Sequence, residues 1–457
     1  MKVTMEKLQA LARSRGFVYP DSEIYGGMAN TWDYGPLGVE LKNNFKKLWW
    51  KHFVQERPDM VGVDTALIMN PKVWEASGHV GGFTDVLADC TKCKLRFRAD
   101  HLIEDALKID VEGKSNEDIS KLLKDSNIKC PNCKAVRWTD ARSFNLLFKT
   151  HVGVTEDDKS IAYLRGETAQ GMFTDFKHVL STSRKRLPLG IAQVGKAFRN
   201  EITPGNYIFR TREFEIAEFE YFIPQNIWEE KFEFWLGKMK EFAAIIGIKE
   251  KDLHVHEIPE EKRAHYSKRT VDLEFDFPFG QKELWGLAYR TDFDLLNHEK
   301  SSGEDLKYTD PTTNEKYLPH VIEPTFGVDR SLLAILLSAY MEERVEGKDE
   351  LRVVLKLPKE LAPYKVAILP LSKDEKLSPR AMEVFDILAK KYSTEYDETQ
   401  SIGKRYRRQD EIGTPYCVTV DFDTLEDKAV TVRDRDSMKQ ERIAINKLES
   451  YLDEKFK

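Results

Sequence analysis

Apolar residues repeat with helical and strand periods through the first three quarters of the chain. After Pro36, apolar side chains recur every three or four residues, which predicts an amphipathic helix over residues 36–55. Period-two alternation on both sides of Pro204 predicts two strands joined by a turn within residues 191–222. Similar patterns predict four further strands and an apolar helix, in order at residues 61–69, 271–277, 283–290, 320–325 and 328–341. These elements favour a mostly antiparallel sheet flanked by helices, an α+β fold.

The pattern changes after Pro358 to short alternating strand and helix units. Strands are expected at residues 364–369, 393–396, 416–421 and 428–432, and helices at 381–392, at 400–412 and from 443 onward. Such alternation is typical of a separate α/β domain, and the remaining length is normal for independent folding. We therefore predict an α/β domain over residues 360–457.

Four of the five cysteines form two pairs with metal-ligand spacing. The pairs are Cys90 with Cys93 and Cys130 with Cys133. Each spacing lets a tight turn aim two thiolates at one tetrahedral Zn²⁺, so we expect a structural zinc site; four unrelated thiols are the alternative. The polar segment around the pairs predicts a metal-stapled, zinc-ribbon-like insertion over residues 87–158. This insertion would divide a catalytic domain into residues 1–86 and 159–350.

Composition narrows the classes of protein that these elements can form. With 457 residues, 41% of them apolar and 32% charged, the chain has the size of two or three domains. Because no stretch of about 18 apolar residues occurs and no secretory signal begins the chain, we expect a cytoplasmic protein without a membrane span. An organellar transit peptide over residues 1–15 is the alternative. The net charge of -6 does not by itself indicate a nucleic-acid partner.

An aromatic residue, an arginine and an acid lie in the first of the two predicted central strands. The residues are Phe198, Arg199 and Glu201, and the second strand brings Arg210 and Phe214. By the family resemblance given below, Arg199 would bind an α-phosphate, where charge develops during attack, and Arg210 would hold the γ-phosphate. The same resemblance implies that Phe214 stacks on adenine and that Glu201 accepts a hydrogen bond from its amino group. Alternation predicts that Arg199 and Glu201 share one face of a strand, and ordinary cross-strand ion pairs are the alternative function of these charges.

A second segment, residues 323–330, joins a predicted strand to an apolar helix. Gly327 permits close backbone approach, and Arg330 would meet the outer phosphates from the side opposite Arg199, near a helix N-terminus. The alternative for Arg330 is a buried structural ion pair. The chain has neither a Walker loop nor a Rossmann fingerprint, so the common alternative nucleotide-binding folds lose support.

These two segments resemble the second and third motifs of class II aminoacyl-tRNA synthetases. The first motif is less regular, because Ala66 stands where a proline is expected after the predicted helix at 36–55. Over its whole length the chain resembles the dimeric glycyl-tRNA synthetases. Residues 34–38, 74–79, 97–101, 167–171, 290–292, 323–325 and 431–436 carry this resemblance. Two departures are Gly166, where the family generally has proline, and Thr325, where it generally has serine.

The resemblance implies an antiparallel-sheet catalytic domain of class II type with a zinc-binding insertion and a C-terminal α/β anticodon-binding domain. It implies tRNA(Gly), glycine and ATP as partners, Mg²⁺ with the ATP, structural Zn²⁺ and a homodimer. In the C-terminal domain, Lys404, Arg405 and Arg408 could contact tRNA. A solvated charged helix is the alternative for those three side chains.

The resemblance also assigns residues to an ATP site. They are Arg199, Asn200, Glu201, Phe209, Arg210, Thr211, Arg212, Glu213, Phe214, Glu283, Leu284, Gly327, Val328, Asp329 and Arg330. Among these, Arg199 and Arg330 would be the catalytic residues, acting by charge neutralisation. Glu283 is the candidate Mg²⁺ ligand, with an exposed structural carboxylate as the alternative.

A glycine site is implied by the same resemblance. Its residues would be Arg98, Glu167, Phe214, Glu215, Ile216, Ala217, Glu218, Arg290, Glu323, Pro324, Thr325, Phe326 and Gly327. The carboxylates Glu167, Glu218 and Glu323 would surround the ammonium of glycine, and Arg98 and Arg290 would lie near its carboxylate. Thr325 would close off the space beyond Cα, although a surface position is the alternative for Glu218.

The implied reaction needs no protein nucleophile. The glycine carboxylate would attack the α-phosphorus of ATP, pyrophosphate would leave, and the terminal hydroxyl of tRNA would take the glycyl group. Two alternatives stay open: a synthetase for another amino acid, which would change the carboxylate pocket, and a non-catalytic relative that binds nucleic acid or a polymerase. Retention of Arg199, Glu201, Arg210 and Arg330 argues against loss of catalysis.

Overall fold

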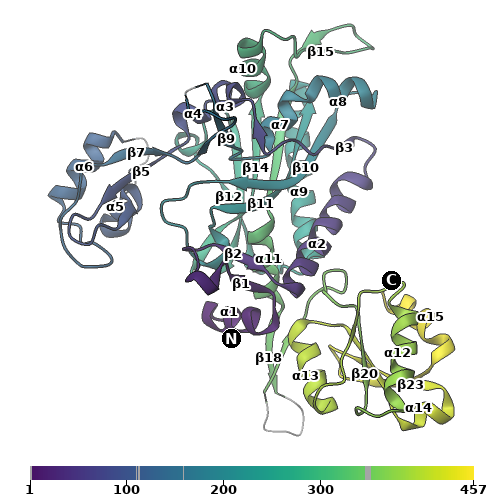
Figure 1. Ribbon diagram of the computed structural model, residues 1–457. Helices are drawn as coiled ribbons and strands as arrows, with labels where there is room; N and C mark the ends of the chain where they lie inside the picture. Colours follow the sequence, from purple (N-terminus) through teal and green to yellow (C-terminus); the bar gives the residue numbers. More distant parts are fainter. Residues whose placement is uncertain (1–2, 110, 112–113, 158, 345–350, 457) are drawn as a thin grey trace.

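A seven-stranded sheet forms the centre of the molecule (Figure 1). The structure is a computed structural model and describes residues 3–109, 111, 114–157, 159–344 and 351–456. Across the sheet, the strands are β12 (Leu253–Glu257), β13 (Arg269–Phe277), β14 (Gly280–Thr291), β17 (His320–Gly327), β11 (Glu213–Ile223), β10 (Leu189–Phe198) and β3 (Met60–Gly62). All neighbours are antiparallel except β10 and β3. The prediction of a mostly antiparallel sheet is therefore confirmed.

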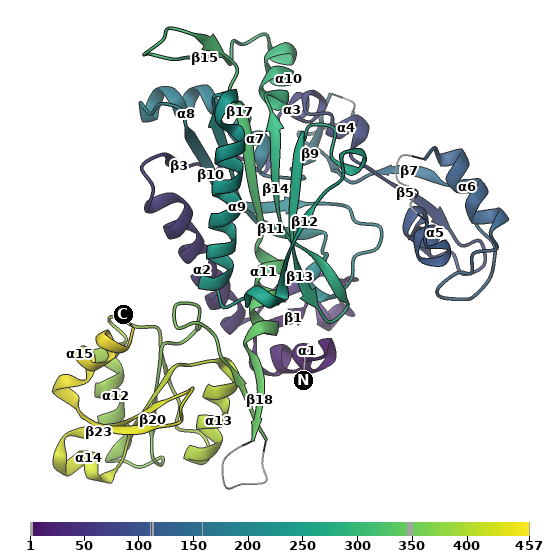
Figure 2. The same cartoon turned by 180° about the vertical axis from the view of Figure 1, so that it is seen from behind.

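Three helices cover one face of this sheet. They are α2 (Pro36–Trp50), α9 (Trp228–Ile245) and α11 (Val328–Ala339), and Figure 2 shows α9 lying along the back of the strands. Aromatic side chains fill the space between the layers, among them Trp49, Phe53 and Phe326. The predicted helix at 36–55 is confirmed as α2, which a π-helical turn (Lys51–Gln55) continues.

The opposite face of the sheet is covered at one end only by short helices. These are α7 (Ala169–Thr174), α8 (Phe176–Ser183) and α10 (Phe293–Ser302). A smaller apolar core that includes Phe173, Phe176 and Phe222 lies beneath them. Beyond this core, the same face of β11 and β17 presents polar side chains, and the candidate site lies there.

The single strand predicted at 61–69 is wrong, because the chain changes sheets within it. Its first part is β3 in the central sheet, and its last part is β4 (Ile68–Met69), which pairs with β9 (Ile161–Leu164). β8 (Phe148–His151) completes that three-stranded sheet. The polar residues between β3 and β4 cross from one sheet to the other.

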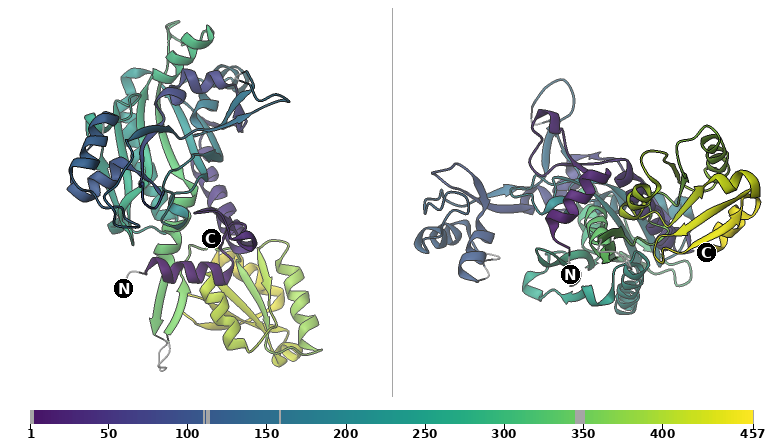
Figure 3. Two further views of the ribbon diagram at one scale, coloured as in Figure 1. Left: turned by 60° about the vertical axis from the view of Figure 1, so that its left-hand side comes forward. Right: turned by 90° about the horizontal axis from the view of Figure 1, so that it is seen from below.

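The cysteine pairs lie in a small unit that projects from the side of the central sheet (Figures 1 and 3). Its elements are β5 (Thr84–Asp89), β6 (Arg96–Arg98), α5 (Ala99–Leu107), α6 (Asn116–Asp125) and β7 (Arg142–Asn145). Ile103, Leu123 and Trp138 belong to a core of its own. The domain boundaries stay a prediction, and residues 158 and 350, at which two of them were placed, lie outside the described residues.

The C-terminal part forms a separate five-stranded sheet with helices. Its strands, in order across the sheet, are β21 (Thr394–Tyr396), β20 (Val366–Pro370), β22 (Tyr416–Val420), β23 (Ala429–Asp434) and β24 (Gln440–Ala444). Its helices are α12 (Leu377–Leu388), α13 (Ile402–Ile412), α14 (Phe422–Asp427) and α15 (Ile445–Lys455). The predicted α/β alternation is confirmed, whereas β24, which is mostly polar and exposed, and the short helix α14 were missed.

A hairpin of β18 (Tyr340–Arg344) and β19 (Leu351–Leu355) leads from α11 to the C-terminal sheet. The predicted apolar helix therefore ends at Ala339 instead of residue 341. The N-terminal helix α1 (Met5–Arg15) lies beside this hairpin and α13, with ion pairs between Lys7 and Glu342 and between Arg15 and Glu411 (Figure 3). None of the described helices is long and apolar enough to cross a membrane.

Smaller elements complete the described chain. They are β1 (Val18–Pro20), β2 (Trp32–Tyr34), α3 (Pro71–Ala76), α4 (His79–Gly82), β15 (Tyr308–Thr309) and β16 (Lys316–Tyr317). The first two form a small ribbon next to α1 and α2, and α3 packs against α7 and α10.

Candidate active site

The loop of residues 199–212 joins β10 to β11 and carries the first predicted phosphate ligands. The prediction that these residues continue the two strands is wrong, because β10 ends at Phe198 and β11 begins at Glu213. Two consecutive residues of the loop have φ values of 56° and 62°, in the left-handed region that ends regular strand pairing. The charged side chains therefore project from a turn and not from a pleated face.

Backbone hydrogen bonds close this loop at its base and near its tip. The N–H of Arg199 donates to the carbonyl of Arg212 at 2.9 Å, and the N–H of Gly205 donates to the carbonyl of Arg210 at 3.0 Å. Nε of Arg210 donates to a carboxylate oxygen of Glu201 at 2.8 Å. An ordinary ion pair, the alternative for these charges, is thus present for Arg210 and Glu201, and their contacts with ATP stay a prediction.

Arg199 has a different environment, between two aromatic rings. Its guanidinium carbon lies 5.2 Å from the ring centre of Phe83 and 5.3 Å from that of Phe214. Nε donates to the carbonyl oxygen of Gly166 at 3.1 Å. Within the described parts of the chain, no carboxylate pairs with this guanidinium. Its charge is therefore oriented by neutral groups and is available to an anion in the adjoining cavity.

Arg330 lies in the first turn of α11 and faces the same cavity. Its Nη1 donates to the Glu283 carboxylate at 2.9 Å, and its guanidinium lies 4.4 Å from the ring centre of Phe209. Asp329 fixes the start of this helix by accepting hydrogen bonds from the backbone N–H of Glu215 at 2.7 Å and from Lys42 at 3.1 Å. The strand β11 and the helices α2 and α11 are thus joined directly beneath the cavity.

One cavity unites the predicted nucleotide ligands from β11, β14, β17, α11 and the loop. It is lined by Arg199, Glu201, Ile208, Phe209, Arg210, Thr211, Phe214, Glu215, Ile216, Glu283, Leu284, Thr325, Gly327, Asp329 and Arg330. Four predicted ATP residues do not line it, namely Asn200, Arg212, Glu213 and Val328. Val328 is buried in the main core, and Glu213 pairs with Lys196 at the surface.

Buried carboxylates lie on the same sheet face, next to Thr325. Glu218 accepts hydrogen bonds from the hydroxyls of Thr168 at 2.5 Å and Thr325 at 2.8 Å. Glu323 accepts one from Nη1 of Arg290 at 2.7 Å. Since Glu218 is 2% exposed, the surface position that was the alternative for this side chain is wrong.

A hydrogen-bonded network surrounds these carboxylates. Arg290 donates from Nε and Nη2 to the two oxygens of Asp294, both at 2.8 Å. Gln170 donates to Glu167 at 2.8 Å and to Asp294 at 3.1 Å, and it contacts Nε2 of His298 at 2.8 Å. Carboxylates of the chain therefore take the donors of Arg290 in this arrangement, and its contact with a substrate carboxylate stays a prediction.

Electrostatics divides the carboxylates into two kinds. Burial, with the nearby charge of Glu167, raises the pKa of Glu218, and burial raises the pKa of Glu323 to about 8. For Glu167 burial works in the same direction, but the charge and hydrogen bond of His79, whose Nε2 lies 3.4 Å away, hold its pKa below the usual range. The cluster thus combines one carboxylate whose pKa is lowered with two carboxylates whose pKa values are raised by burial.

Several predicted glycine-site residues point elsewhere. Arg98 pairs with Asp100 and, at 3.1 Å, with Asp85, so its guanidinium is engaged within the insertion. Glu215 pairs with two lysines of α2, each at 3.0 Å. Ala217 and Phe326 are buried in the main core on the other face of the sheet. Only their backbone atoms are therefore on the side of the carboxylates.

Known proteins are similar to this chain in sequence and in fold. The family described as tRNA synthetase class II core domain (G, H, P, S and T) matches residues 148–340, and the family described as anticodon binding domain matches residues 365–455. The glycine–tRNA ligases of Alkaliphilus metalliredigens and Acetivibrio thermocellus are 56% and 58% identical, over 99% and 100% of this chain and 99% of each of their own. The chain belongs to the glycine–tRNA ligase family. A structure of prolyl-tRNA synthetase from Cryptosporidium parvum, complexed with halofuginone and AMPPNP, shares the fold at 16% identity, with a TM-score of 0.61 over 98% of this chain and 76% of that chain.

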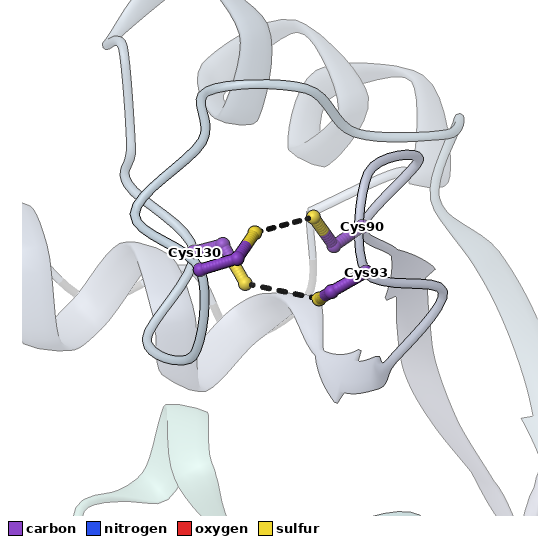
Figure 4. A group of neighbouring side chains, drawn as sticks. Cys90, Cys93 and Cys130 are labelled. Carbon is purple, nitrogen blue, oxygen red and sulfur yellow. Dashed lines mark hydrogen bonds between the residues drawn. The ribbon is translucent and has the colours of Figure 1, made fainter.

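The predicted class II fold with its anticodon-binding domain is thereby confirmed. The fit of the predicted cysteine site to a metal rests on the positions of its four sulfur atoms. Sγ of Cys90 lies 3.5 Å from that of Cys133, and Sγ of Cys93 lies 3.7 Å from that of Cys130 (Figure 4). Four sulfurs around Zn²⁺ at about 2.3 Å are separated by about 3.8 Å. The arrangement therefore fits a tetrahedral structural zinc site.

Two carboxylates approach a common point beside the nucleotide cavity. A Cβ at Gly286 would lie 3.9 Å from an oxygen of Asp272 and 3.9 Å from an oxygen of Glu283. Burial and the charge of Glu283 raise the pKa of Asp272 to about 7, whereas the charge of Arg330 lowers that of Glu283. Oxygen donors of this kind fit Mg²⁺, and Asp272 is a neighbour that the sequence did not single out.

In the C-terminal domain, the three predicted tRNA contacts are not equivalent. Arg405 is 0% exposed and donates to the carbonyls of Asp397 and Leu371, each at 3.0 Å. The prediction that Arg405 could contact tRNA is therefore wrong, because its buried guanidinium is hydrogen-bonded to the residues that directly follow β20 and β21. Arg408 pairs with Asp397, and Lys404 is exposed.

Sequence reasoning missed the side chains that support the carboxylates. Thr168 and Gln170 lie inside the segment 167–171 that carried the family resemblance, and His79 ends another such segment. Their positions in these segments were the sequence signal that could have identified the three supporting side chains. Asp294 had no comparable signal, because Arg290 lies at the end of β14 and Asp294 lies in the first turn of α10, so the ion pair between them joins a strand to a helix.

Proposed function

We propose that this chain forms glycyl-adenylate from glycine and ATP in the cavity beside β11 and then transfers the glycyl group to the 3′ end of tRNA(Gly). The observation that carries the proposal is the direct adjacency of two sites on one sheet face. Thr325 lines the nucleotide cavity and donates to Glu218 of the carboxylate cluster. A substrate with an ammonium group bound there would present its carboxylate to the nucleotide.

The chemistry requires positioning and charge neutralisation by the chain. An oxygen of the glycine carboxylate forms a bond to the α-phosphorus, and the bond from phosphorus to the bridging oxygen breaks with its electron pair on pyrophosphate. Arg199, held by Gly166 and without a carboxylate partner in the described chain, stabilises charge on the α-phosphate. Arg330 lies on the other side of the cavity and holds the departing phosphates.

Nucleotide binding uses the remaining lining groups. Phe214 stacks on the adenine, Glu201 accepts from its amino group, and Arg210 moves from Glu201 to the γ-phosphate. Mg²⁺ held by Glu283, with Asp272 beside it, supplies further positive charge to the phosphates when it is bound.

Glycine is selected by charge and by lack of space. The carboxylates Glu167, Glu218 and Glu323 receive the ammonium, and the methyl and hydroxyl of Thr325 fill the volume that a larger side chain would need. Arg290 keeps Glu323 in place through their contact at 2.7 Å. Exclusion by filled space is effective because overpacking a closed pocket costs about 1–3 kcal/mol or more.

The remaining assignments follow from the other parts of the chain. Zn²⁺ bound by the four cysteines staples the insertion, and the C-terminal domain binds the anticodon arm of the tRNA, with Lys404 as an accessible contact. We also propose that the protein acts as a homodimer in the cytoplasm. The first motif, through α2, would supply part of the dimer contact.

The direct test is aminoacylation. Purified protein, ATP, Mg²⁺, labelled glycine and tRNA(Gly) transcript should yield acid-precipitable glycyl-tRNA, and a tRNA for another amino acid should stay uncharged. Tandem replacement of Arg199 and Arg330 by alanine is the matched inactive control. Binding of tRNA without any charging, under conditions in which the protein is folded, would instead establish the non-catalytic alternative.

A further inference from the structure

The side chain of Glu220 is buried next to the proposed ammonium site, without a hydrogen-bond partner in the part of the chain that the structure describes. It is 0% exposed, and neither carboxylate oxygen has a hydrogen-bond partner among the described residues. One of its oxygens lies within 4.8 Å of oxygens from both Glu218 and Glu323. A carboxylate in such a place must be compensated by a cation or a proton, because an isolated buried charge costs far more than a fold can supply.

Strand register places Glu220 directly opposite another acid. Glu218 pairs with Thr325 and Tyr221 pairs with Ile322 across β11 and β17, so Glu220 faces Glu323. Its other cross-strand neighbour is Ile191 of β10, which belongs to the apolar core beneath α7 and α8. Like charges that face each other in neighbouring strands repel, and a dry environment increases the repulsion.

The cations of the surroundings are already taken. Arg290 from β14 donates to both oxygens of Asp294 and to Glu323, with donor–acceptor distances of 2.7–2.8 Å. The other titratable groups around these acids are Glu218 from β11, Glu167 before α7, Asp294 and His298 from α10, Tyr266 and Arg165. Arg165 donates to the backbone carbonyls of Lys196 and Thr65. Within the described chain, Glu323 therefore has a cationic partner and Glu220 has none, which distinguishes the two acids.

We infer that Glu220 is a neutral carboxylic acid that keeps its proton when glycine binds, and that it then acts as a positioning residue by donating a hydrogen bond to Glu323, which loses its own proton on that binding. Both oxygens of Glu218 already accept from Thr168 and Thr325, so Glu323 is the acceptor with capacity left. The inference rests on the proposed function only for its effect on glycine, since the protonation state belongs to the free protein as well.

A neutral hydrogen-bond donor at Glu220 would limit the negative charge of the pocket. Glycine brings one positive charge, and four ionised glutamates around it would leave the pocket strongly anionic after binding. A proton on Glu220 removes one of these charges and fixes the orientation of Glu323 toward the ammonium. Burial, together with the charge of Glu323, raises the pKa of Glu220 well above its usual value, which agrees with this geometry.

Infrared spectroscopy of the whole protein tests the proton directly. Wild-type protein at neutral pH should show the carbonyl band of a protonated carboxylic acid that E220Q lacks, and the band should persist after glycine is added. Absence of any difference between the two proteins would overturn the inference. If E220Q does not fold, a pH titration of wild-type protein with ¹³C-labelled glutamate carboxyls reports the same proton, and its absence at neutral pH would be equally decisive.

Kinetics tests the positioning role. E220Q, which retains a donor, should keep the wild-type KM for glycine in ATP–pyrophosphate exchange, and E220L should raise it about tenfold or more, because a hydrogen bond to a charged acceptor is lost. A rise in KM for E220Q as large as that for E218Q would mean that ionised Glu220 contacts the ammonium, and stoichiometric metal at the cluster would mean a cation site; either result overturns the inference. Wild-type protein without any exchange would refute the proposed function and leave the infrared result standing.

Discussion

The hydroxyl of Thr325 donates to Glu218 across two neighbouring strands, with 2.8 Å between Oγ1 and Oε1. Thr325 also lines the nucleotide cavity, so one side chain touches both halves of the proposed site. The family resemblance predicts serine at this position, and threonine keeps the hydroxyl while adding a methyl group. In the proposed function, selection of glycine and its activation by ATP would therefore meet at Thr325.

Removing the Thr325 hydroxyl should weaken glycine binding and leave ATP binding nearly unchanged. Thr325→Val keeps the shape but deprives Glu218 of a donor, and the KM for glycine should rise about 10- to 100-fold. Thr325→Ser is the matched control and should behave like wild type. Equal effects of the two variants on glycine would show that the hydroxyl is not what matters.

Arg199→Ala should abolish most of the exchange activity without unfolding the protein. Among the residues that the structure describes, the guanidinium makes one hydrogen bond, to Gly166, so little structure depends on it. Loss of charge stabilisation at the α-phosphate should lower kcat about 100- to 1,000-fold. Exchange rates and thermal unfolding measure the two effects, with exposed Arg186→Ala as the control. Wild-type kcat in Arg199→Ala would remove this residue from the catalytic set.

The KM for glycine should fall as pH rises from about 6 to 8. Burial raises the pKa of Glu323 to about 8, so the free protein holds a proton that the ammonium of glycine must displace below that pH. For one released proton, the apparent affinity gains at most about tenfold per pH unit. Calorimetry in buffers of different ionisation enthalpy would count the proton directly. A pH-independent KM over this range would contradict the account.

The raised pKa of Glu323 also affects stability: its contribution to the free energy of unfolding decreases as pH rises. The folded-state pKa of Glu323 lies above its unfolded value of about 4.3. The stabilising contribution of this proton is therefore fully present below pH of about 4.3 and is lost as pH rises through about 8. Glu323→Gln should remove this part of the pH dependence in denaturant unfolding.

Zinc removal should affect the insertion before the rest of the protein. Cys93→Ser breaks the tetrahedral set, so elemental analysis should find the bound zinc reduced or lost. Hydrogen exchange should increase in α5 and α6, which share the insertion core with Cys90 and Cys130, and stay unchanged in β11. Cys417→Ser is the control, since this buried thiol lies in the C-terminal sheet. Full zinc content in Cys93→Ser would refute the four-cysteine site.

Regular patterns in the sequence predicted the parts of the fold that repeat. The helix after Pro36 and strand β13 follow from apolar periodicity because each buries one face, and β14 and β17 follow from apolar runs that are buried on both faces. Local alternation failed in residues 199–212 and 61–69, where the chain leaves one sheet or turns sharply. Tertiary contacts determine the conformation of such segments, and the apolar periodicity of the sequence carries no information about those contacts.

The chemistry of the site was predictable at the level of motifs and less so at the level of contacts. Arg199, Arg330 and Thr325 line one cavity as expected. Burial of Arg405 against backbone carbonyls was not foreseeable, since the sequence of a basic helix predicts that its charged side chains are exposed to solvent. The unpartnered state of Glu220 likewise depends on strand register across β11 and β17, which no single segment of sequence contains.

ATP–pyrophosphate exchange with each amino acid in turn tests the central claim most directly. The arrangement of Thr325, Glu218 and Glu323 predicts exchange that depends on glycine, with alanine and serine far weaker and with threonine and proline inactive. Exchange with another amino acid in place of glycine would contradict the assigned pocket, and no exchange with any amino acid would contradict catalysis itself.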